Sequence, residues 1–436
     1  MAGEHTPHLE LLARGTSPQP KPSRRPLLNP DLVNADQPRT SVANAPIRSP
    51  VAWRTIAIQA SLVWLATRVL LIATTYFTVV LNLGSRTSKG YVVGTHSLAD
   101  LGSAWVQWDA YWYIRIAEHG YYSQQSTAFF PLYPLLVHLA TLPFGPSSTT
   151  AAAMVVSNLA AWAAFTAIGW LAASELGPQD SEGPIRTMIL LAAFPLAFFM
   201  AAAYSESLFI ALAALTLLSA RRGYWYWAAA AAFGAALTRP VGAILILPLA
   251  IELLRQQPWR RHSRLIPALT SLGAVPLAIA AFMALQWQFF NNPILFLEVQ
   301  SRFWQRRALP PWQTAQAIWD HLVHNPTLGD WQALLVLDLG LFSGMMVITL
   351  IAARSQPRAF TAYSAALLIS CIVTPNLSNL NPVSSAGRFV IGMLPAFLFL
   401  GQTGRRRTGL QAILIGGGFM LQGVLLTLYL SGAWLE

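Results

Sequence analysis

The chain has 436 residues, of which 55% are hydrophobic and only 10% are charged. Soluble globular proteins have about 25% charged residues. So few charges cannot cover the surface of a soluble protein of this length, and the composition therefore predicts an all-α polytopic membrane protein.

The rest of the composition excludes other classes of function. The one cysteine, Cys371, excludes an internal disulfide and a cysteine-based metal site. We interpret the net charge of +11 as a topology signal, not as a nucleic-acid site, because basic loops stay on the cytoplasmic side of a membrane. The sequence has no P-loop, no GxGxxG before a helix and no HExxH. ATP-driven transport and zinc proteolysis are therefore not supported.

Residues 1–50 are polar and rich in Pro, Ser, Asn and Arg, which predicts a disordered cytoplasmic tail. Residues 53–432 are expected to form a single membrane domain with about 11–13 transmembrane helices. Within this domain, charged residues or Gly and Pro separate the apolar segments. These segments are residues 55–82, 128–144, 149–173, 187–204, 205–220, 224–238, 240–254, 264–286, 331–353, 359–374, 389–403 and 409–432.

The positions of Lys and Arg predict the orientation. If the N-terminus is inside and segment 128–144 enters and leaves the membrane on one side, eleven crossings remain and most of the 28 basic residues face the cytoplasm. If that segment crosses, the Arg221–Arg222 pair and the basic cluster at 260–264 move outside, against the positive-inside rule. We therefore expect two long outside loops, residues 83–127 and 287–330. Three short turns share the outer face: 204–207, 238–240 and 375–388.

The first outside loop contains WVQWDAYWYIRIAEHGYY at residues 105–122. Read as a helix, this segment places its tryptophans, Arg115 and His119 on one face at steps of three or four. Such an amphipathic helix would lie along the membrane interface, and an aromatic anchor without chemistry also explains it.

Asp109 lies among these aromatic residues and has two interpretations. It either caps a helix that starts at Ala110 or serves as a general base, for which a position of low dielectric near the acceptor is suitable. Glu118 and His119 follow about 14–15 Å further along the helix, which is too far to pair with Asp109.

Several other charges are expected at the outer face. Glu206, in the turn AYSESLF, is either simply hydrated or contacts a substrate hydroxyl or a metal. Arg239 and Arg388 adjoin apolar segments, and each could bind a phosphate at the headgroup level or extend towards lipid without specificity. Arg302 and Arg306 lie four residues apart, either as a solvated basic face or as a site for an anionic headgroup or sugar phosphate.

Arg68 interrupts the first span. Charges inside a membrane are usually functional or paired, and Asp338, in a later span, is a candidate partner.

The segments WDAYWYIRIAEHGY and AFFPLYPLL, at residues 108–121 and 128–136, resemble the signature of the PIG-V family, which includes GPI mannosyltransferase II and bacterial relatives. AYSESLF, LTRPVG and SSAGRF resemble later landmarks of the family and occur in the same order. The resemblance covers most of residues 53–432. The sequence departs from the family pattern at Phe389, where Tyr is expected, and in its long polar N-terminal tail.

The resemblance implies a GT-C fold, a lipid-linked sugar phosphate as donor and a catalytic carboxylate in the first outside loop. It also implies polyprenyl- or dolichyl-phosphate-mannose as donor and transfer with inversion. In this interpretation Asp109 is the general base, and Arg388 holds the leaving phosphate together with Arg239 or an arginine from 302–307. The substrate-binding residues expected are Trp108, Tyr113, His119, Glu206, Arg239, Arg302, Arg306 and Arg388.

The expected partners are the polyprenyl-phosphate-linked sugar, a lipid, glycan or protein acceptor, and membrane lipids. No cofactor is certain, and a divalent cation shared by Asp109 and Glu206 stays open. The expected location is the membrane, as a multi-pass protein, which is the inner membrane if the source is bacterial. A lipid or lipid-linked sugar flippase is the alternative function, and a catalytically inactive scaffold is a third.

Overall fold

The computed structural model describes residues 50–81, 98–260, 262–324, 330–377 and 381–433. In these ranges all regular secondary structure is helical, and the one β-bridge joins Arg306 to Asn376. The predicted all-α class is therefore confirmed. The tail predicted for residues 1–50 lies outside the described residues except for Pro50. Residues 83–97 of the predicted first outside loop also lie outside them.

Five helices are long and apolar enough to cross a membrane, among the residues described. They confirm that the chain is an integral membrane protein. These helices are α1 (Pro50–Val80), α5 (Thr149–Leu176), α10 (His262–Phe290), α13 (Asp330–Ala352) and α17 (Thr408–Leu430).

The other predicted apolar segments form shorter helices. None of these helices reaches the roughly 20 residues that a straight crossing needs. They are α4 (Leu132–Thr141), α6 (Gly183–Ala192), α7 (Glu206–Arg221), α8 (Trp225–Thr238), α9 (Ile246–Gln256), α14 (Arg358–Val373) and α16 (Leu394–Gly404). Outside these segments lie α2 (Leu98–Ser103), α3 (Asp109–His119), α11 (Leu295–Arg302) and α12 (Pro311–His324), and α15 (Ala386–Val390) overlaps the start of segment 389–403.

Proline explains why some of the shorter helices stop where they do. A residue before proline is disfavoured in the helical region and adopts an extended conformation. Arg239 precedes Pro240 and has φ −152° and ψ 149°, so α8 ends at Thr238 and the short helix η6 (Pro240–Leu245) begins after it. Irregular backbone of this kind survives at membrane depth only where it is buried in protein or lines a cavity.

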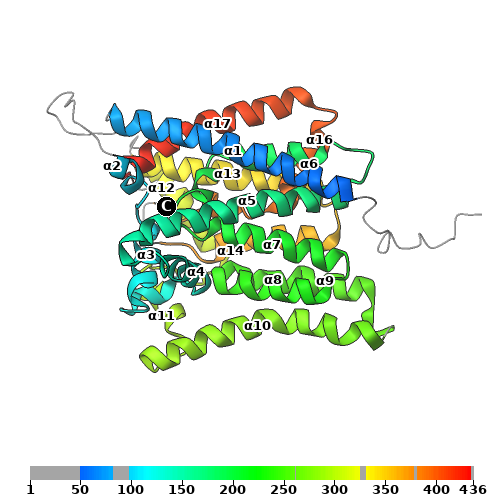
Figure 1. The fold of residues 1–436 in the computed structure, drawn as a ribbon, viewed down its shortest axis with the longest axis horizontal. Coiled ribbons are helices and arrows are strands. Elements are labelled where there is room, and N and C mark those ends of the chain that lie inside the picture. The colour runs from blue at the N-terminus through cyan, green and yellow to red at the C-terminus, as the bar shows by residue number, and fades with distance from the viewer. Residues whose placement is uncertain (1–49, 82–97, 261, 325–329, 378–380, 434–436) are drawn as a thin grey trace, which may run out of the picture. The chain divides into compact units, whose positions relative to one another are not determined.

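Small residues let the central helices pack closely. Helix α5 packs on α7, α7 on α8, and α8 on α10 (Figure 1). Helix α8 contains the run AAAAA, and its inward side is lined by alanine and glycine. Small residues allow helix backbones to approach one another where lipid provides no hydrophobic driving force. A second group joins α6 to α16 and α13 to α15 and α16.

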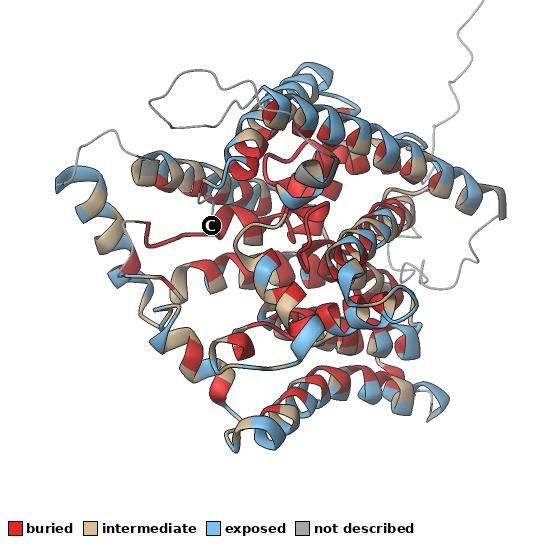
Figure 2. Ribbon diagram, turned by 60° about the vertical axis from the view of Figure 1, so that its left-hand side comes forward, coloured by how far each residue is buried: buried red, intermediate tan, exposed pale blue. Residues whose placement is uncertain are grey.

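Large apolar side chains face outward from the long outer helices. In Figure 2 the exposed faces of the helices point away from the buried interior. Ile72 of α1, Ile266 of α10 and Ile413 of α17 are all more than half exposed. An apolar surface this extensive fits lipid, not water.

Helices α1 and α17 run in the same direction. Near their C-terminal ends, the hydroxyl oxygens of Thr78 and Thr427 lie 3.3 Å apart. Pro50 and Leu430 therefore lie at opposite ends of these two helices (Figure 1). Helix α4 is about 15 Å long, half of the hydrocarbon thickness, and it packs against both α3 and α5. Such a short helix suits a segment that enters and leaves on one side.

Gly418 of α17 is expected to tolerate no side chain. A Cβ there would lie 2.1 Å from the carbonyl oxygen of Ala193, and overpacking of this kind typically costs about 1–3 kcal/mol. Gly418→Ala should therefore lower the unfolding temperature in detergent, measured by reaction of the buried thiol of Cys371 with a dye during heating. Gly417→Ala is the matched control because nothing lies within 4 Å of a Cβ at that position. Equal unfolding temperatures for the two variants would contradict the packing described.

Candidate active site

Three segments that are distant in sequence meet at Arg388. Its Nη1 lies 2.9 Å from Oδ2 of Asp109 at the start of α3, and its Nε lies 3.3 Å from Oε1 of Glu206 at the start of α7. The side chains of Arg388, Asp109 and Glu206 are 8%, 15% and 3% exposed. Buried charges are stable only when they are paired, so these contacts hold α3, α7 and α15 together.

Arg239 adds a second cation to the same carboxylate. Its Nη1 forms an ion pair with Oε1 of Glu206. Arg239 lies between α8 and η6, and its backbone is extended because it precedes Pro240. Glu206 therefore joins two arginines that come from separate breaks in the helical structure.

The aromatic ring of Phe389 lies against three guanidinium groups. Those of Arg239, Arg306 and Arg388 lie 5.5, 5.5 and 5.9 Å from its ring centroid. The negative face of an aromatic ring attracts cations, so the ring stabilises like charges that repel one another. The family resemblance leads us to expect Tyr at this position, and the ring of Phe389 alone is sufficient for this contact.

Arg306 is held by the segment before α15. Its Nη2 donates a hydrogen bond to the carbonyl oxygen of Ser384 at 2.8 Å. Burial, followed by the charge of Arg388, lowers the pKa of Arg306. A nearby anion would relieve that repulsion and stabilise the charged form.

A cavity of about 970 Å³ opens beside this cluster. The charged residues that line it are Asp109, Arg239, Arg306, Arg307 and Arg388, so four cations face one carboxylate. Phenylalanine, tryptophan and aliphatic side chains form most of the remaining wall. Such a lining fits a ligand that has an anionic group next to a large apolar part.

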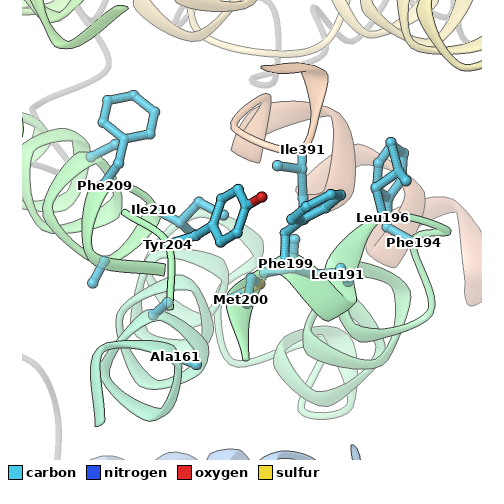
Figure 3. Packing of buried hydrophobic residues seen from close by; sticks show 14 of the residues in the cluster. Ala161, Leu191, Phe194, Leu196, Phe199, Met200, Tyr204, Phe209, Ile210 and Ile391 are labelled. Atoms are coloured by element: carbon cyan, nitrogen blue, oxygen red, sulfur yellow. The ribbon is translucent and has the colours of Figure 1, made fainter. Parts of the chain in front are cut away.

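Tyr113 connects the cavity to the buried core. Its hydroxyl oxygen lies 2.7 Å from Oγ of Ser205, next to Glu206. Burial raises the pKa of Tyr113, so its hydroxyl stays neutral. The guanidinium of Arg388 also lies 5.6 and 5.5 Å from the rings of Phe199 and Tyr204, and Figure 3 shows these two rings in the buried hydrophobic cluster.

Three of the five non-glycine residues with positive φ in the described part of the chain lie at or next to the site. Trp108, Gln305 and Ser385 have φ values of 51°, 54° and 67°, in the left-handed region that favours glycine. Trp108 directly precedes Asp109, Gln305 directly precedes Arg306, and Ser385 lies three residues before Arg388. Strained conformations of this kind persist where the surrounding structure fixes them, and they often mark functional sites.

The structure brings together six of the residues expected from the sequence and leaves three elsewhere. Trp108 donates from Nε1 to the carbonyl oxygen of Ala433 at 3.3 Å and does not line the cavity. The side chain of His119 is 51% exposed and that of Arg302 is 68% exposed. The six that meet at the cavity or its ion pairs are Asp109, Tyr113, Glu206, Arg239, Arg306 and Arg388.

The helix expected in the first outside loop is present as α3, but two details differ. It begins at Asp109, so Asp109 is not its N-cap; Trp108 occupies that position. The expected common face is also only partly correct: Trp112, Arg115 and His119 keep their spacing within α3, whereas the positive φ of Trp108 ends the helical register before it reaches Trp105. Trp105 is 7% exposed and donates from Nε1 to Oγ1 of Thr75 at 3.2 Å.

The ion pair expected between Arg68 and Asp338 is not present. Asp338 instead accepts hydrogen bonds from Nδ2 of Asn381 at 2.7 Å and from the backbone N–H of Gly387 at 2.8 Å. Arg68 donates to Oγ1 of Thr67 at 3.2 Å. The two donors to Asp338 come from the segment before Arg388. The sequence prediction considered only charges inside apolar segments as partners, so it could not identify these donors.

Asp109 and Glu206 converge, as a shared metal site would require. The cation between them is the guanidinium of Arg388. In the described part of the chain, no group of three or more His, Cys, Asp or Glu side chains is placed to hold a metal ion.

Sequence reasoning missed the supporting residues of the site. In the sequence, Ser205, Ser384 and Phe389 stand only as parts of the motifs AYSESLF and SSAGRF, and their contacts depend on which segments meet. For Ser205 and Phe389 the available signal is a position directly next to an isolated charge, and Ser384 has no such signal.

The comparisons with known proteins agree with the motifs. Residues 50–256 match the family model described as mannosyltransferase (PIG-V). This match confirms the family resemblance over that part of the chain, which carries Asp109, Glu206 and Arg239. No curated protein matches the sequence.

Among solved structures, the chain is similar to ArnT from Cupriavidus metallidurans bound to undecaprenyl phosphate. The identity is 16%, the TM-score is 0.46, and the similarity covers 79% of this chain and 62% of ArnT. It is also similar to the oligosaccharyltransferase of Archaeoglobus fulgidus, with 13% identity, a TM-score of 0.40, and coverage of 85% of this chain and 56% of that one. The chain thus spans less than two thirds of the length of either protein, and the match to the mannosyltransferase family model covers residues 50–256.

Glu206→Gln is expected to destabilise the protein, because two buried arginines would lose their shared carboxylate. Breaking a buried ion pair costs about 3–5 kcal/mol, so the thermal unfolding temperature in detergent should fall clearly. Glu182→Gln is the matched control: Glu182 also pairs with an arginine, Arg186, but its side chain is 78% exposed, and exposed pairs contribute about 1 kcal/mol or less. An equal effect of both substitutions would contradict the role given to Glu206.

Proposed function

We propose that this protein is a membrane glycosyltransferase that moves mannose, or a similar hexose, from a polyprenyl-phosphate-linked donor to an acceptor hydroxyl. The observation that carries the proposal is the cavity in which one carboxylate, Asp109, faces four arginines. A sugar phosphate ester needs both features, a base for the incoming hydroxyl and cations for the departing phosphate. The match of residues 50–256 to the PIG-V mannosyltransferases supports the choice of sugar.

Asp109 is proposed as the general base. Its Oδ2 is bound to Arg388, whereas Oδ1 accepts no hydrogen bond from any residue that the structure describes. Asp109 lines the cavity, so its carboxylate can reach a bound hydroxyl. The carboxylate takes the hydroxyl proton while the hydroxyl oxygen attacks the anomeric carbon. Attack from the side opposite the phosphate gives inversion at that carbon.

Arginines are proposed to stabilise the leaving group. As the bond between the anomeric carbon and the phosphate oxygen breaks, its electron pair stays with the phosphate, which gains one negative charge. Arg306 and Arg388 both line the cavity, their guanidinium groups both lie against the ring of Phe389, and they can donate to that oxygen. Because the leaving phosphate is a stabilised anion, no general acid is required, and the fixed cations lower the barrier.

The lipid part of the donor explains why the site lies in a membrane protein. Phe129, Val241, Ile244 and Phe296 line the cavity next to the arginines. They can contact the first isoprene units while the remaining prenyl chain stays in the bilayer. We place this site at the outer face, with the N-terminal end of α1 in the cytoplasm, because the positive-inside rule favours that orientation.

A flippase is the rival function. A transporter requires polar groups along a path through the membrane. In the described part of the chain, the charges around the cavity come from the start of α3, the start of α7, the residue after α8, the loop after α11 and α15. At the opposite end of α7, Arg221 is paired with Glu175 and Glu252. This segregation favours a transferase, with chemistry at one face.

Asp109→Asn is expected to reduce turnover by about 10²–10⁴-fold, the usual contribution of general base catalysis. The measurement is transfer of radiolabelled mannose from polyprenyl-phosphate-mannose by the purified protein, to an acceptor or to water. Glu118→Gln on the same helix is the control and should keep its activity, because Glu118 is exposed and does not line the cavity. Wild-type turnover by Asp109→Asn would exclude Asp109 as the base. Donor binding without transfer by the wild type would favour the flippase.

Arg306→Gln is expected to weaken binding of polyprenyl phosphate by about 10–100-fold. A hydrogen bond to a charged group contributes about 1.5–3 kcal/mol, and every 1.4 kcal/mol changes Kd tenfold. Titration of the detergent-solubilised protein with undecaprenyl phosphate measures this effect. Arg302→Gln is the matched control because its guanidinium is exposed and outside the cavity. Equal affinities of the two variants would remove Arg306 from the phosphate site.

A further inference from the structure

One buried carboxylate, Asp338 of α13, has no part in the chemistry described above. It is the only charged residue between Trp331 and Ala352, and it is 6% exposed. A carboxylate inside a membrane span is costly unless it has partners or a function. We propose that Asp338 is a positioning residue for Arg388, an inference that rests on the transferase function proposed above.

The two oxygens of Asp338 bind two ends of one segment. Oδ2 accepts from the side-chain amide of Asn381 at 2.7 Å, and Oδ1 accepts from the backbone N–H of Gly387 at 2.8 Å. Gly387 directly precedes Arg388. A single side chain in a long, regular helix therefore fixes the backbone from which Arg388 projects.

The segment between Asn381 and Gly387 has little regular structure of its own. It contains two turns, in which Ser384 N–H donates to the Asn381 carbonyl at 3.0 Å and Ala386 N–H donates to the Val383 carbonyl at 2.9 Å. The carbonyl of Ser384 also accepts the hydrogen bond from Arg306. Asp338 thereby holds the backbone segment that carries Arg388 and that binds Arg306, the two arginines assigned to the leaving phosphate. A displacement of about 1 Å at a reacting site can cost 10²-fold in rate.

Gly387 lies tightly against its partner. A Cβ at this position would lie 2.9 Å from Oδ1 of Asp338 and 2.9 Å from Cδ1 of both Leu196 and Leu341. A side chain at position 387 would therefore displace the hydrogen bond. This close approach shows that the segment is seated on α13 at the residue next to Arg388.

Geometry, not negative charge, is what Asp338 supplies. An asparagine has nearly the same shape and keeps one acceptor for the N–H of Gly387. Oδ1 of Asn381 is buried and accepts no hydrogen bond from the described residues. If the side-chain amide of Asn381 rotates by 180°, this oxygen can accept a hydrogen bond from the amide of an asparagine at position 338. A leucine has a similar volume and removes both acceptors.

The first measurement is mannose transfer by Asp338→Leu and Asp338→Asn in the full-length protein. Asp338→Leu should lower kcat by about 10²-fold with a smaller change in KM, because the misplaced cations act mainly on the transition state. Asp338→Asn should retain turnover within about threefold of the wild type. Equal loss in both variants would mean that the charge itself is needed, and the proposal would be wrong.

The second measurement needs no donor. The unfolding temperatures of Asp109→Asn, Arg388→Gln and the double variant give the coupling between Asp109 and Arg388, with the thiol of Cys371 as reporter. This coupling should be present when Asp338 is intact and absent in the Asp338→Leu background. In the Asp338→Asn background the coupling should be present again. A general loss of stability in the Asp338 variants would not produce this difference between leucine and asparagine.

Persistence of the coupling in the Asp338→Leu background would overturn the proposal whatever the activity. If the wild type transfers no mannose, the proposed function fails, but the coupling still decides whether Asp338 positions Arg388. The two failures are therefore distinguishable.

Discussion

Repulsion between closely placed arginines is the constraint on which the rest of the site depends. Arg239, Arg306 and Arg388 surround one aromatic ring, and in an apolar environment such charges repel strongly unless counter-charges are present. Glu206 offsets two of them, and Asp109 contacts one from the other side. The same contacts hold the starts of α3 and α7 against α15, so the charges that shape the cavity also stabilise the packing around it.

Much of this arrangement could be predicted from the sequence. Apolar segments predicted the helices because a bilayer requires long runs of apolar residues and satisfied backbone groups. Asp109, Glu206, Arg239 and Arg388 were recognised for a related reason. Glu206, Arg239 and Arg388 lie at or beside apolar segments, and Asp109 lies among aromatic residues; a charge in such a position is costly unless it has a partner or a function. The structure makes them partners of one another.

The remaining details depend on single backbone angles and on long-range contacts. Arg302 and Arg306 lie four residues apart, a spacing that places both on one face of a continuous helix. Helix α11 ends at Arg302, and the positive φ of Gln305 turns the chain, so Arg306 reaches the cavity while Arg302 stays exposed. Similarly, no local pattern indicates that Asp338 binds the backbone N–H of Gly387. Such contacts appear only when the segments have been placed in space.

The separation of Asp109 and Arg388, 279 positions along the chain, has a consequence for biosynthesis. Chains are made and fold from the N-terminus onward, so Asp109, Glu206 and Arg239 reach the membrane well before Arg388. During this interval the early carboxylates lack one of their counter-ions and are best kept in water at the membrane surface. The cavity becomes complete only when α15 arrives. A nascent chain could therefore insert most of its helices before it can act on a lipid-linked sugar.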